Sequence, residues 1–308
     1  MPDKRKHKVV CFGEVLWDIF PFGEMPGGAP MNVTYHLKKF NVEANLITRV
    51  GNDVRGNRLM QMFSDKGISA DHFQTDPDHS TGEVIVHQNE RKELTYDIRR
   101  PAAWDFISPD AAHANLMADA DCFVYGTLAA RNRMSQDTLI GLLEMAQYKF
   151  MDVNLRSPNF SLELVEQLLQ RADFVKMNLE ELEVLTEPFS TYQRVEDRLA
   201  NFQDRYKVSK IVVTMGADGA IMAIWDQVLR SPGISVSVQD AVGAGDAFLA
   251  GFLSKILDHV HYQKALDFAC VAGAFVASQK GACPEYDIEQ VDDLIQIQTQ
   301  ENLNFKSF

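Results

Sequence analysis

The chain has 308 residues, of which 46% are hydrophobic and 24% are charged, a composition typical of globular proteins. This length is sufficient to bury a large core, which argues against disorder. The formal net charge of −13 argues against a nucleic-acid surface, because binding to phosphate backbones depends on clustered Lys and Arg. A small anionic ligand is still compatible with this charge, since backbone N–H groups and one or two local cations can hold it.

Cysteine usage and the N-terminus indicate the compartment. The four cysteines are far apart and lack the paired spacing of a zinc or redox site. Sparse, scattered cysteines fit a reducing compartment. Residues 1–8 are charged and lead directly into an apolar strand pattern, and no later apolar run approaches the roughly 18 residues of a membrane span. We therefore expect a soluble cytoplasmic protein.

Short apolar, β-branched runs alternate with longer segments of helical period, which is typical of a mostly parallel sheet with crossover helices. The predicted strands are 8–13, 44–50, 121–126, 149–153, 173–177 and 210–214. The predicted helices between them are 29–40, 54–66, 135–147, 161–170 and 192–206. The expected fold class is therefore α/β, with helices on both faces of the sheet. Length alone would permit two domains, but no linker or repeat divides the chain.

Other segments depart from this alternation. Residues 15–20, 82–88 and 94–98 predict a small antiparallel sheet outside the main one, with the polar turn 89–92 joining the last two strands.

The C-terminal third predicts an antiparallel sheet edge followed by two helices. The predicted edge strands are 220–224, 227–230 and 234–238. The helices 243–257 and 262–277 are rich in Ala and Gly on their packing faces, which either close packing or a flat ligand against the backbone would explain.

The most informative segment runs from Asp240 through Gly243-Ala244-Gly245-Asp246 into the helix. A loop of small residues before a helix exposes N–H groups at the positive end of the helix dipole, which suits phosphate charge. The alternative is that the glycines only shape a turn while Asp246 caps the helix. Spacing alone leaves these two interpretations balanced.

An aspartate at a helix start is expected to be an anionic acceptor at neutral pH. In phosphoryl transfer the proton of the nucleophile leaves late, so a modest base within hydrogen-bond reach of the hydroxyl is sufficient. The sequence has neither a GxxxxGK[ST] segment nor a kinase-type glycine loop before a lysine-bearing strand. If phosphate is handled, this loop is the segment that must do it.

These residues resemble the hallmark of the PfkB, or ribokinase-like, carbohydrate kinases, an aspartate followed by a Gly-Ala-Gly-Asp anion hole. Further segments match that family's motifs in the right order: Gly13-Glu14 with Asp18, Gly27-Gly28-Ala29-Pro30-Met31-Asn32, Gly51-Asn52-Asp53 with Gly56, Asn178-Leu179-Glu180-Glu181, and Thr214-Met215-Gly216-Ala217-Asp218-Gly219. The resemblance spans residues 13 to 246. It implies a ribokinase-like three-layer sandwich with a mostly parallel central sheet, one domain over 1–308, and a small β-sheet lid formed by segments of about 15–26 and 80–100.

The resemblance implies a sugar site near the N-terminus. Asp18 offers two acceptors for vicinal hydroxyls, Gly27 and Gly28 let a ring approach the backbone, and Asn32 offers a donor and an acceptor. A turn with a helix cap is the alternative. Arg100 and Trp104 follow the predicted hairpin and are expected to shape the sugar pocket, although Trp104 fits a core position equally well.

On the nucleotide side the resemblance implicates two segments. Asn178 and Glu181 share a helix face and are expected to hold Mg²⁺ through water, with a capping pair as the alternative. The glycine-rich segment contributes Thr214, Gly216 and Gly219.

Two further roles follow from the same resemblance. Asp240 and nearby carbonyls, including those of Val242 and Gly281, are implied to bind a monovalent cation. Val242 replaces the usual threonine, a change that a backbone-carbonyl contact would tolerate but that leaves a K⁺ requirement open. The segment Asp152-Val153-Asn154-Leu155-Arg156 resembles the fructokinase branch, in which Arg156 would neutralise nucleotide phosphates; a surface ion pair is the alternative.

The sequence therefore predicts an ATP-dependent sugar kinase that uses Mg²⁺, with fructose as the first candidate acceptor and ribose, 2-keto-3-deoxygluconate or a nucleoside as alternatives. A dinucleotide-binding oxidoreductase is the alternative from another class, but it needs a GxGxxG after the first strand, where Gly13-Glu14-Val15-Leu16-Trp17-Asp18 stands instead. A catalytically dead sugar sensor would require loss of the base, and Asp246 is intact. The exposed edges of the lid predict a homodimer contact.

Overall fold

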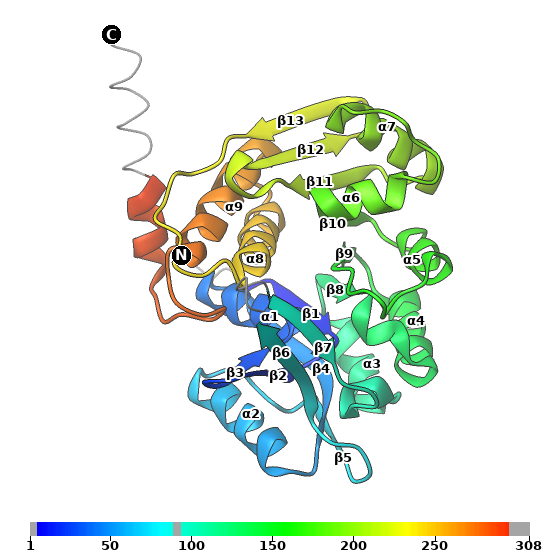
Figure 1. Ribbon diagram of the computed structural model, residues 1–308, viewed down its shortest axis with the longest axis vertical. Helices are drawn as coiled ribbons and strands as arrows, with labels where there is room; N and C mark the ends of the chain where they lie inside the picture. Colours follow the sequence, from blue (N-terminus) through cyan, green and yellow to red (C-terminus); the bar gives the residue numbers. More distant parts are fainter. Residues whose placement is uncertain (1–4, 89–93, 296–308) are drawn as a thin grey trace. The chain divides into compact units, whose positions relative to one another are not determined.

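The computed structural model describes residues 5–88 and 94–295, and the chain divides into two compact units (Figure 1). Unit 1 comprises residues 1–35 and 43–172, and unit 2 comprises residues 36–42 and 173–308. The expectation of one domain over 1–308 stays a prediction. No helix within the described residues is both long and apolar enough to cross a membrane.

Unit 1 is built on parallel strands in the order β9, β8, β1, β4, β5. Their bounds are β1 Lys8–Phe12, β4 Glu43–Gly51, β5 Phe73–Asp76, β8 Cys122–Gly126 and β9 Lys149–Asp152. In β1, residues Val9 to Phe12 are buried, as expected for a parallel strand covered on both faces. Such continuous apolar runs explain why four of these strands are predictable. β5 has the sequence Phe-Gln-Thr-Asp, which carries too little apolar character to predict a strand.

Side-chain caps mark the start of most helices that begin in unit 1. These helices are α1 Ala29–Lys39, α2 Val54–Asp65, α3 Ala111–Ala118, α4 Arg133–Met145 and α5 Leu162–Leu169, with 3-10 turns at Ala103–Phe106 and Leu128–Arg131. The side chains of Asp53, Asp110, Asn132 and Ser161 accept hydrogen bonds from the first turns of α2 to α5 in that order. The cap at Asn132 starts α4 two residues before the predicted position. α3 was not predicted.

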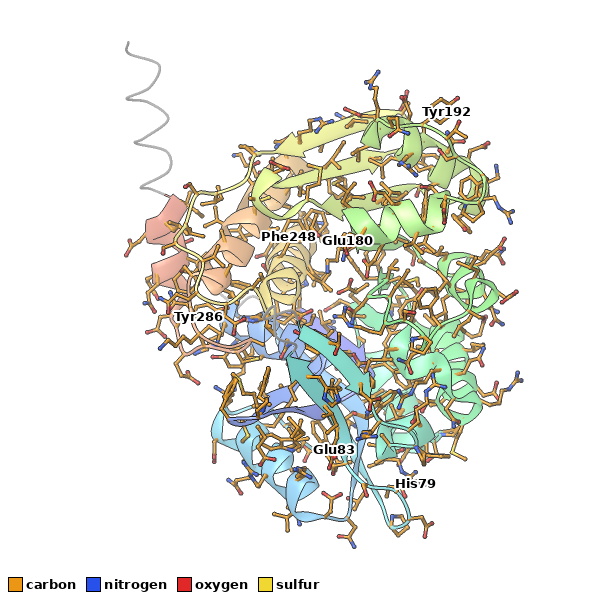
Figure 2. The ribbon with its side chains drawn as sticks, in the orientation of Figure 1. His79, Glu83, Glu180, Tyr192, Phe248 and Tyr286 are labelled. Atoms are coloured by element: carbon orange, nitrogen blue, oxygen red, sulfur yellow. The ribbon has the colours of Figure 1, made fainter. Side chains whose placement is uncertain are left out.

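A separate small sheet has the strand order β3, β2, β6, β7. Its strands are β2 Leu16–Phe20, β3 Gly23–Gly27, β6 Gly82–Gln88, on which Glu83 is labelled in Figure 2, and β7 Leu94–Ile98. The prediction of a purely antiparallel sheet is wrong, because β2 and β6 run parallel. Only hairpin neighbours are forced to be antiparallel, whereas a long connection separates β2 from β6. The predicted turn 89–92 lies outside the described residues.

Asp53 joins α2 to the segment that enters β6. Its Oδ1 accepts from the Gly56 N–H at 2.7 Å and from the Thr81 hydroxyl at 2.7 Å, and its Oδ2 accepts from the Thr81 N–H at 2.8 Å. Burial raises the pKa of Asp53, but these hydrogen bonds outweigh burial and leave it below its usual value. Asp53 of the Gly51-Asn52-Asp53 motif therefore fastens the start of α2 to Thr81, the residue directly before β6 of the small sheet.

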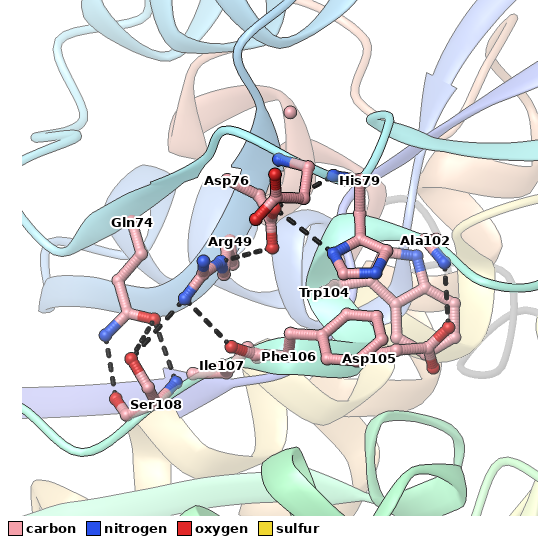
Figure 3. Close-up of polar contacts among 12 residues, drawn as sticks. Arg49, Gln74, Asp76, His79, Ala102, Trp104, Asp105, Phe106, Ile107 and Ser108 are labelled. Carbon is pink, nitrogen blue, oxygen red and sulfur yellow. Dashed lines mark hydrogen bonds and ion pairs between the residues drawn. The ribbon is translucent and has the colours of Figure 1, made fainter.

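The segment that carries Trp104 is fastened by polar contacts in unit 1 (Figure 3). Arg49 Nε lies 2.7 Å from Asp76 Oδ2, and Arg49 also donates to the Phe106 carbonyl oxygen at 3.1 Å. The His79 ring stacks on Phe106 with centroids 3.7 Å apart. These contacts hold the 3-10 turn that buries Trp104 against the main sheet of the unit.

Unit 2 contains strands in the order β10, β11, β12, β13. Their bounds are β10 Phe174–Asn178, β11 Lys210–Thr214, β12 Ala220–Ile224 and β13 Gln227–Ser231. β10 and β11 are parallel, and the two hairpins from β11 to β13 are antiparallel, as predicted. The prediction of a strand at 234–238 is wrong. This segment alternates apolar and small residues, but it is partly exposed and forms no ladder in the described chain.

The glycine loop of residues 240–245 leads into α8 Ala244–Leu257, one of the helices of unit 2. This unit also contains α6 Leu179–Thr186, α7 Val195–Tyr206 and α9 Tyr262–Ala277, with a 3-10 turn at Gly216–Asp218. α8 and α9 lie side by side (Figure 1). An ideal β-carbon on Gly251 would lie 3.0 Å from Ala272 Cβ, and one on Gly273 would lie 3.0 Å from the Ala244 carbonyl oxygen. Close helix packing therefore accounts for the small residues of these helices.

We expect Asp53→Ala to lower the free energy of unfolding by about 2 kcal/mol, because it removes a helix cap and the acceptor of the Thr81 bonds. The measurement is urea unfolding. Asp110→Ala, which removes a cap with one bond to the Ala112 N–H, is the control and should lose less. Because the folded pKa of Asp53 lies below its unfolded pKa, the carboxylate adds stability above the unfolded pKa, and this stability is lost as pH falls through the folded pKa. The free energies of unfolding of wild type and Asp53→Ala should therefore converge below about pH 4. Equal losses for both variants at neutral pH would contradict this account.

Candidate active site

In unit 1 the structure brings Asp18 and Gly27 together. Asp18 lies on β2 and pairs with Met25 of β3, and Leu16 pairs with Gly27. An ideal β-carbon on Gly27 would lie 2.5 Å from Asp18 Oδ2. Gly27 is therefore required for the Asp18 carboxylate to lie over the backbone of β3.

The Asp18 carboxyl has an unusual ionisation. Burial raises its pKa to about 6, although the positive charge of Arg156 opposes this shift. Sequence reasoning assigned Arg156 to the nucleotide phosphates, and in unit 1 its charge acts on the predicted sugar ligand. A half-buried carboxyl beside a guanidinium is suited to bind hydroxyl groups, because it accepts strong hydrogen bonds when ionised.

The segment after Gly27 shapes the start of α1. Gly28 has φ +116°, a conformation that L side chains rarely adopt. Asn32 is buried on α1, and its N–H donates to the Gly28 carbonyl oxygen at 3.0 Å. The predicted glycine pair and asparagine thus occupy one turn of backbone next to β2 and β3.

Arg100 and Trp104 have different surroundings in unit 1. Arg100 is exposed, and its Nε donates to Asn159 Oδ1 at 2.9 Å. Arg100 and Asn159 also line a cavity of about 560 Å³ in the same unit. Trp104 is 0% exposed, and the Arg131 guanidinium lies 3.9 Å from its ring centroid. The burial of Trp104 matches the core alternative, and a sugar contact would require that side chain to become exposed.

In unit 2 the glycine loop leads into α8 as predicted. Gly243 is the N-cap residue with φ 80°, and an ideal β-carbon there would lie 2.6 Å from the Ala282 carbonyl oxygen. Asp246 is the third residue of the helix, so it does not occupy the N-cap position that the capping alternative assigned to it. The first bond of helical spacing joins the Ala247 N–H to the Gly243 carbonyl oxygen at 2.9 Å. Gly245 lies in the first turn of the helix, where N–H groups lack the acceptor one turn earlier that interior residues have.

Lys176 is a candidate site residue that the sequence analysis missed. It is only 7% exposed on β10, and its Nζ would lie 3.3 Å from an ideal β-carbon on Gly245. An ammonium group beside the start of α8 adds positive charge to the positive end of the helix dipole. The sequence feature that indicates it is a lysine inside the apolar strand Phe174–Asn178, because burying a charge there is costly unless another group compensates for it.

Asn178 and Glu181 form the reciprocal capping pair that was the alternative to magnesium binding. The Asn178 N–H donates to Glu181 Oε2 at 2.9 Å, and the Glu181 N–H donates to Asn178 Oδ1 at 2.8 Å. Asn178 also pairs in register with Thr214 on β11. Two predicted nucleotide-side motifs therefore end on neighbouring strands.

The glycine-rich segment after Thr214 is a tight turn. Gly216 has φ 59° and Gly219 has φ 87°. The Met215 N–H donates to the Gly219 carbonyl oxygen at 2.8 Å. A β-carbon on Gly216 would meet open space, so its neighbourhood leaves a flat ligand room to approach.

Asp240, Val242 and Gly281 lie together as predicted. Asp240 Oδ1 accepts from the Val242 N–H at 3.0 Å, and its Oδ2 accepts from the Gly281 N–H at 3.2 Å. The carboxylate thereby connects the two loops whose carbonyls were assigned to a monovalent cation. Carbonyl and carboxylate oxygens are suitable donors for K⁺. Within residues 5–88 and 94–295, no group of three or more His, Cys, Asp or Glu side chains is arranged to hold a metal ion.

Comparisons with known proteins find relatives and solved structures named fructokinase. A probable chloroplastic fructokinase-6 of Arabidopsis thaliana is 29% identical over 307 residues, covering 90% of this chain and 79% of that protein. A fructokinase of Escherichia coli is 28% identical over 302 residues, with 89% and 94% covered. A Vibrio cholerae fructokinase double mutant, solved with fructose, ADP and potassium ion, has a TM-score of 0.77 and 27% identity, covering 90% of this chain and 94% of that one.

The likeness extends over nearly the whole described chain, which confirms the ribokinase-like α/β fold with a separate small sheet. It also argues against the oxidoreductase alternative. The model of the pfkB family carbohydrate kinases matches residues 3–288. The chain therefore belongs to the pfkB family of carbohydrate kinases.

Proposed function

We propose that this protein transfers the γ-phosphoryl group of ATP to a hydroxyl of a sugar, with fructose as the first candidate. The observation that carries the proposal is the start of α8, where Asp246 directly follows a turn whose geometry admits only glycine at 243. Fructose is supported by the relatives named fructokinase at 25–29% identity and by the Asp152-Val153-Asn154-Leu155-Arg156 segment. Another sugar, sugar acid or nucleoside of the same family is the alternative acceptor.

Asp246 acts as the base in this proposal. The hydroxyl oxygen forms a bond to the γ-phosphorus while the bond from that phosphorus to the bridging oxygen of ADP breaks. The hydroxyl proton passes to the Asp246 carboxylate. The N–H groups of Gly245 and Asp246 and the Lys176 ammonium stabilise the charge on the transferring group, and such fixed donors are effective because they need no reorganisation.

Asp18 and Asn32 bind the sugar in this proposal. An ionised Asp18 accepts hydrogen bonds from two neighbouring hydroxyls, and the Gly27 backbone leaves room for the ring. Arg100 and Trp104 contribute to the pocket if their segment moves on binding. The small sheet, formed by residues 16–20, 23–27, 82–88 and 94–98, serves as the lid that excludes water.

The nucleotide is held at the ends of β10 and β11. Thr214, Gly216 and Gly219 accommodate the base of the nucleotide. Arg156 neutralises the charge of the nucleotide phosphates if the sugar site lies close to them. Mg²⁺ shields the phosphate charge when bound, and Glu181 would contact it through water. K⁺ would be held by Asp240 and the carbonyls of Val242 and Gly281.

We also propose a cytoplasmic homodimer that contacts through the small sheet. Phe22 is 83% exposed and its ring stacks on Phe20 with centroids 5.1 Å apart, and Met25 and Tyr96 of the same sheet are exposed. Exposed apolar side chains near strand edges are typical of surfaces that associate.

The proposed activity is tested by assaying purified protein with Mg-ATP and a panel of fructose, ribose, 2-keto-3-deoxygluconate and nucleosides. We expect ADP release to depend on fructose above the other acceptors. Turnover of another acceptor would revise the substrate, and no turnover on any member of the panel would contradict the substrate class.

We expect Asp246→Asn to lower kcat by roughly 10²–10⁴ while the KM for ATP stays nearly constant, because only the proton acceptor is lost. Asp258→Asn, at the opposite end of α8, is the matched control and should retain activity. Thermal unfolding checks that both variants fold. Equal rates for Asp246→Asn and wild type would remove Asp246 from the mechanism.

We expect Asp18→Asn to raise the KM for the sugar far more than the KM for ATP. In the wild type the sugar KM should rise as pH falls through about 6, because the carboxylate becomes protonated, and in the variant this dependence should be absent. The reverse pattern of KM changes would mean that the sugar and nucleotide sites are exchanged.

The same carboxyl affects stability. Its folded pKa of about 6 lies above the unfolded value near 3.9, so the folded state binds the proton more tightly and loses relative stability as pH rises through that range. Asp18→Asn should therefore increase the free energy of unfolding at pH 8 by about 1–3 kcal/mol and have little effect at pH 4. Urea unfolding at both pH values measures this.

A further inference from the structure

The loop that follows α9 supports the glycine turn before α8. An ideal β-carbon on Gly243 would lie 2.6 Å from the carbonyl oxygen, 2.7 Å from Cα and 2.8 Å from Cβ of Ala282. The backbone of Gly243 therefore lies directly against Ala282. Any displacement of Ala282 changes the support of the turn that carries Gly245 and Asp246.

A buried histidine holds the Ala282 carbonyl. His36 is 0% exposed, and its Nε2 lies 2.9 Å from the Ala282 carbonyl oxygen. Because a carbonyl oxygen only accepts hydrogen bonds, Nε2 must carry the proton. No motif in the sequence singles out His36, which lies in the predicted helix 29–40, 246 positions away from Ala282 in the chain.

Tyr286 sets the tautomer of this histidine. Its hydroxyl lies 2.8 Å from His36 Nδ1, which is the acceptor nitrogen in a neutral imidazole protonated at Nε2. Tyr286, labelled in Figure 2, is 4% exposed and packs against Phe40 and Phe275 with ring centroids 6.3 and 5.2 Å apart. Its ring position is therefore fixed by packing independently of its hydroxyl.

We propose that His36 is a positioning residue for phosphoryl transfer, which holds the Ala282 carbonyl against Gly243 while the Tyr286 hydroxyl keeps the proton on Nε2. This inference rests on the proposed kinase function. Small errors in the position of reacting groups can lower rates by about 10² even when substrates still bind. The hydrogen bond from His36 thus controls catalysis through backbone position and does not touch the substrate.

The test compares Tyr286→Phe, His36→Leu and His36→Gln. Tyr286→Phe keeps the packed ring and removes the hydroxyl, and we expect kcat to fall several-fold with the sugar KM unchanged. His36→Leu removes the donor to Ala282, and we expect kcat to fall by about 10- to 100-fold. His36→Gln can place an amide N–H near the position of Nε2, and it should recover part of that loss.

Tyr206→Phe is the matched control, because it removes another buried hydroxyl in unit 2, one that donates to the Leu185 carbonyl oxygen at 3.4 Å. It should lower the melting temperature about as much as Tyr286→Phe and leave kcat unchanged. Matching losses of stability with unchanged kcat in both Tyr286→Phe and His36→Leu would overturn the proposal, since a purely structural role predicts that result.

Hydrogen exchange separates this inference from the proposed function. Amide exchange of residues 241–246 and 280–283 should be faster in Tyr286→Phe than in wild type and unchanged in Tyr206→Phe. If the wild type shows no kinase activity but exchange increases as expected, the kinase proposal fails and the positioning contact stands. If the enzyme is active and exchange is unchanged, the positioning role is contradicted.

Discussion

The start of α8 depends on one position where a side chain cannot be accommodated. Gly243 has a left-handed backbone, and Ala282 occupies the space that its β-carbon would need. An alanine at 243 would strain the backbone and push the neighbouring loop away. The same constraint extends into the helix pair, since Gly273 of α9 leaves room for the Ala244 carbonyl oxygen. The turn of residues 243–246 is therefore positioned by backbone packing on two sides.

In the proposed function, this arrangement explains how an acidic chain binds an anion. The net charge of −13 is spread over the surface, and salt screens charges more distant than about 8 Å. Near the turn, positive field comes from the α8 N-terminus and the buried Lys176, beside the carboxylates of Asp240 and Asp246. A local positive field of this kind affects a bound phosphate more than the remote negative surface does. Net charge therefore excludes extended polyanions without excluding a nucleotide.

Much of the fold was predictable because its signals are local. Buried parallel strands such as β1 are continuous apolar runs, and the start of α2 follows an aspartate cap. Segments with weak local signals failed: β5 has little apolar character, and β3 contains two glycines and a proline. The parallel pairing of β2 with β6 was also missed, because it depends on the path of a long connection. Residues 234–238 show the opposite error. Their alternation of apolar and small residues predicts a strand, but the segment pairs with none of the described strands.

The site was predictable where a motif fixes the backbone and less so where partners come from distant segments. Asp240, Val242 and Gly281 meet as expected, and Asn178 with Glu181 adopts the capping geometry that spacing alone also allowed. Lys176 and His36 were missed, because their relevance depends on Gly245 and Ala282, which are far away in sequence. Contacts of this range leave no periodic pattern in the chain.

In the proposed function, sugar recognition by Asp18 opposes the stability of the folded protein. Its carboxyl is buried enough to raise its pKa to about 6, so at neutral pH the folded protein keeps an anion in an environment that disfavours it. A bound sugar can supply hydrogen bonds that water no longer provides, so binding should relieve part of this penalty. A carboxylate recognises neighbouring hydroxyls in many sugars, whereas discrimination among them requires shape and unpaired polar groups around the ring. In the proposed function, recognition of the sugar class and recognition of one sugar therefore depend on different residues, and Asp18 is assigned the first role.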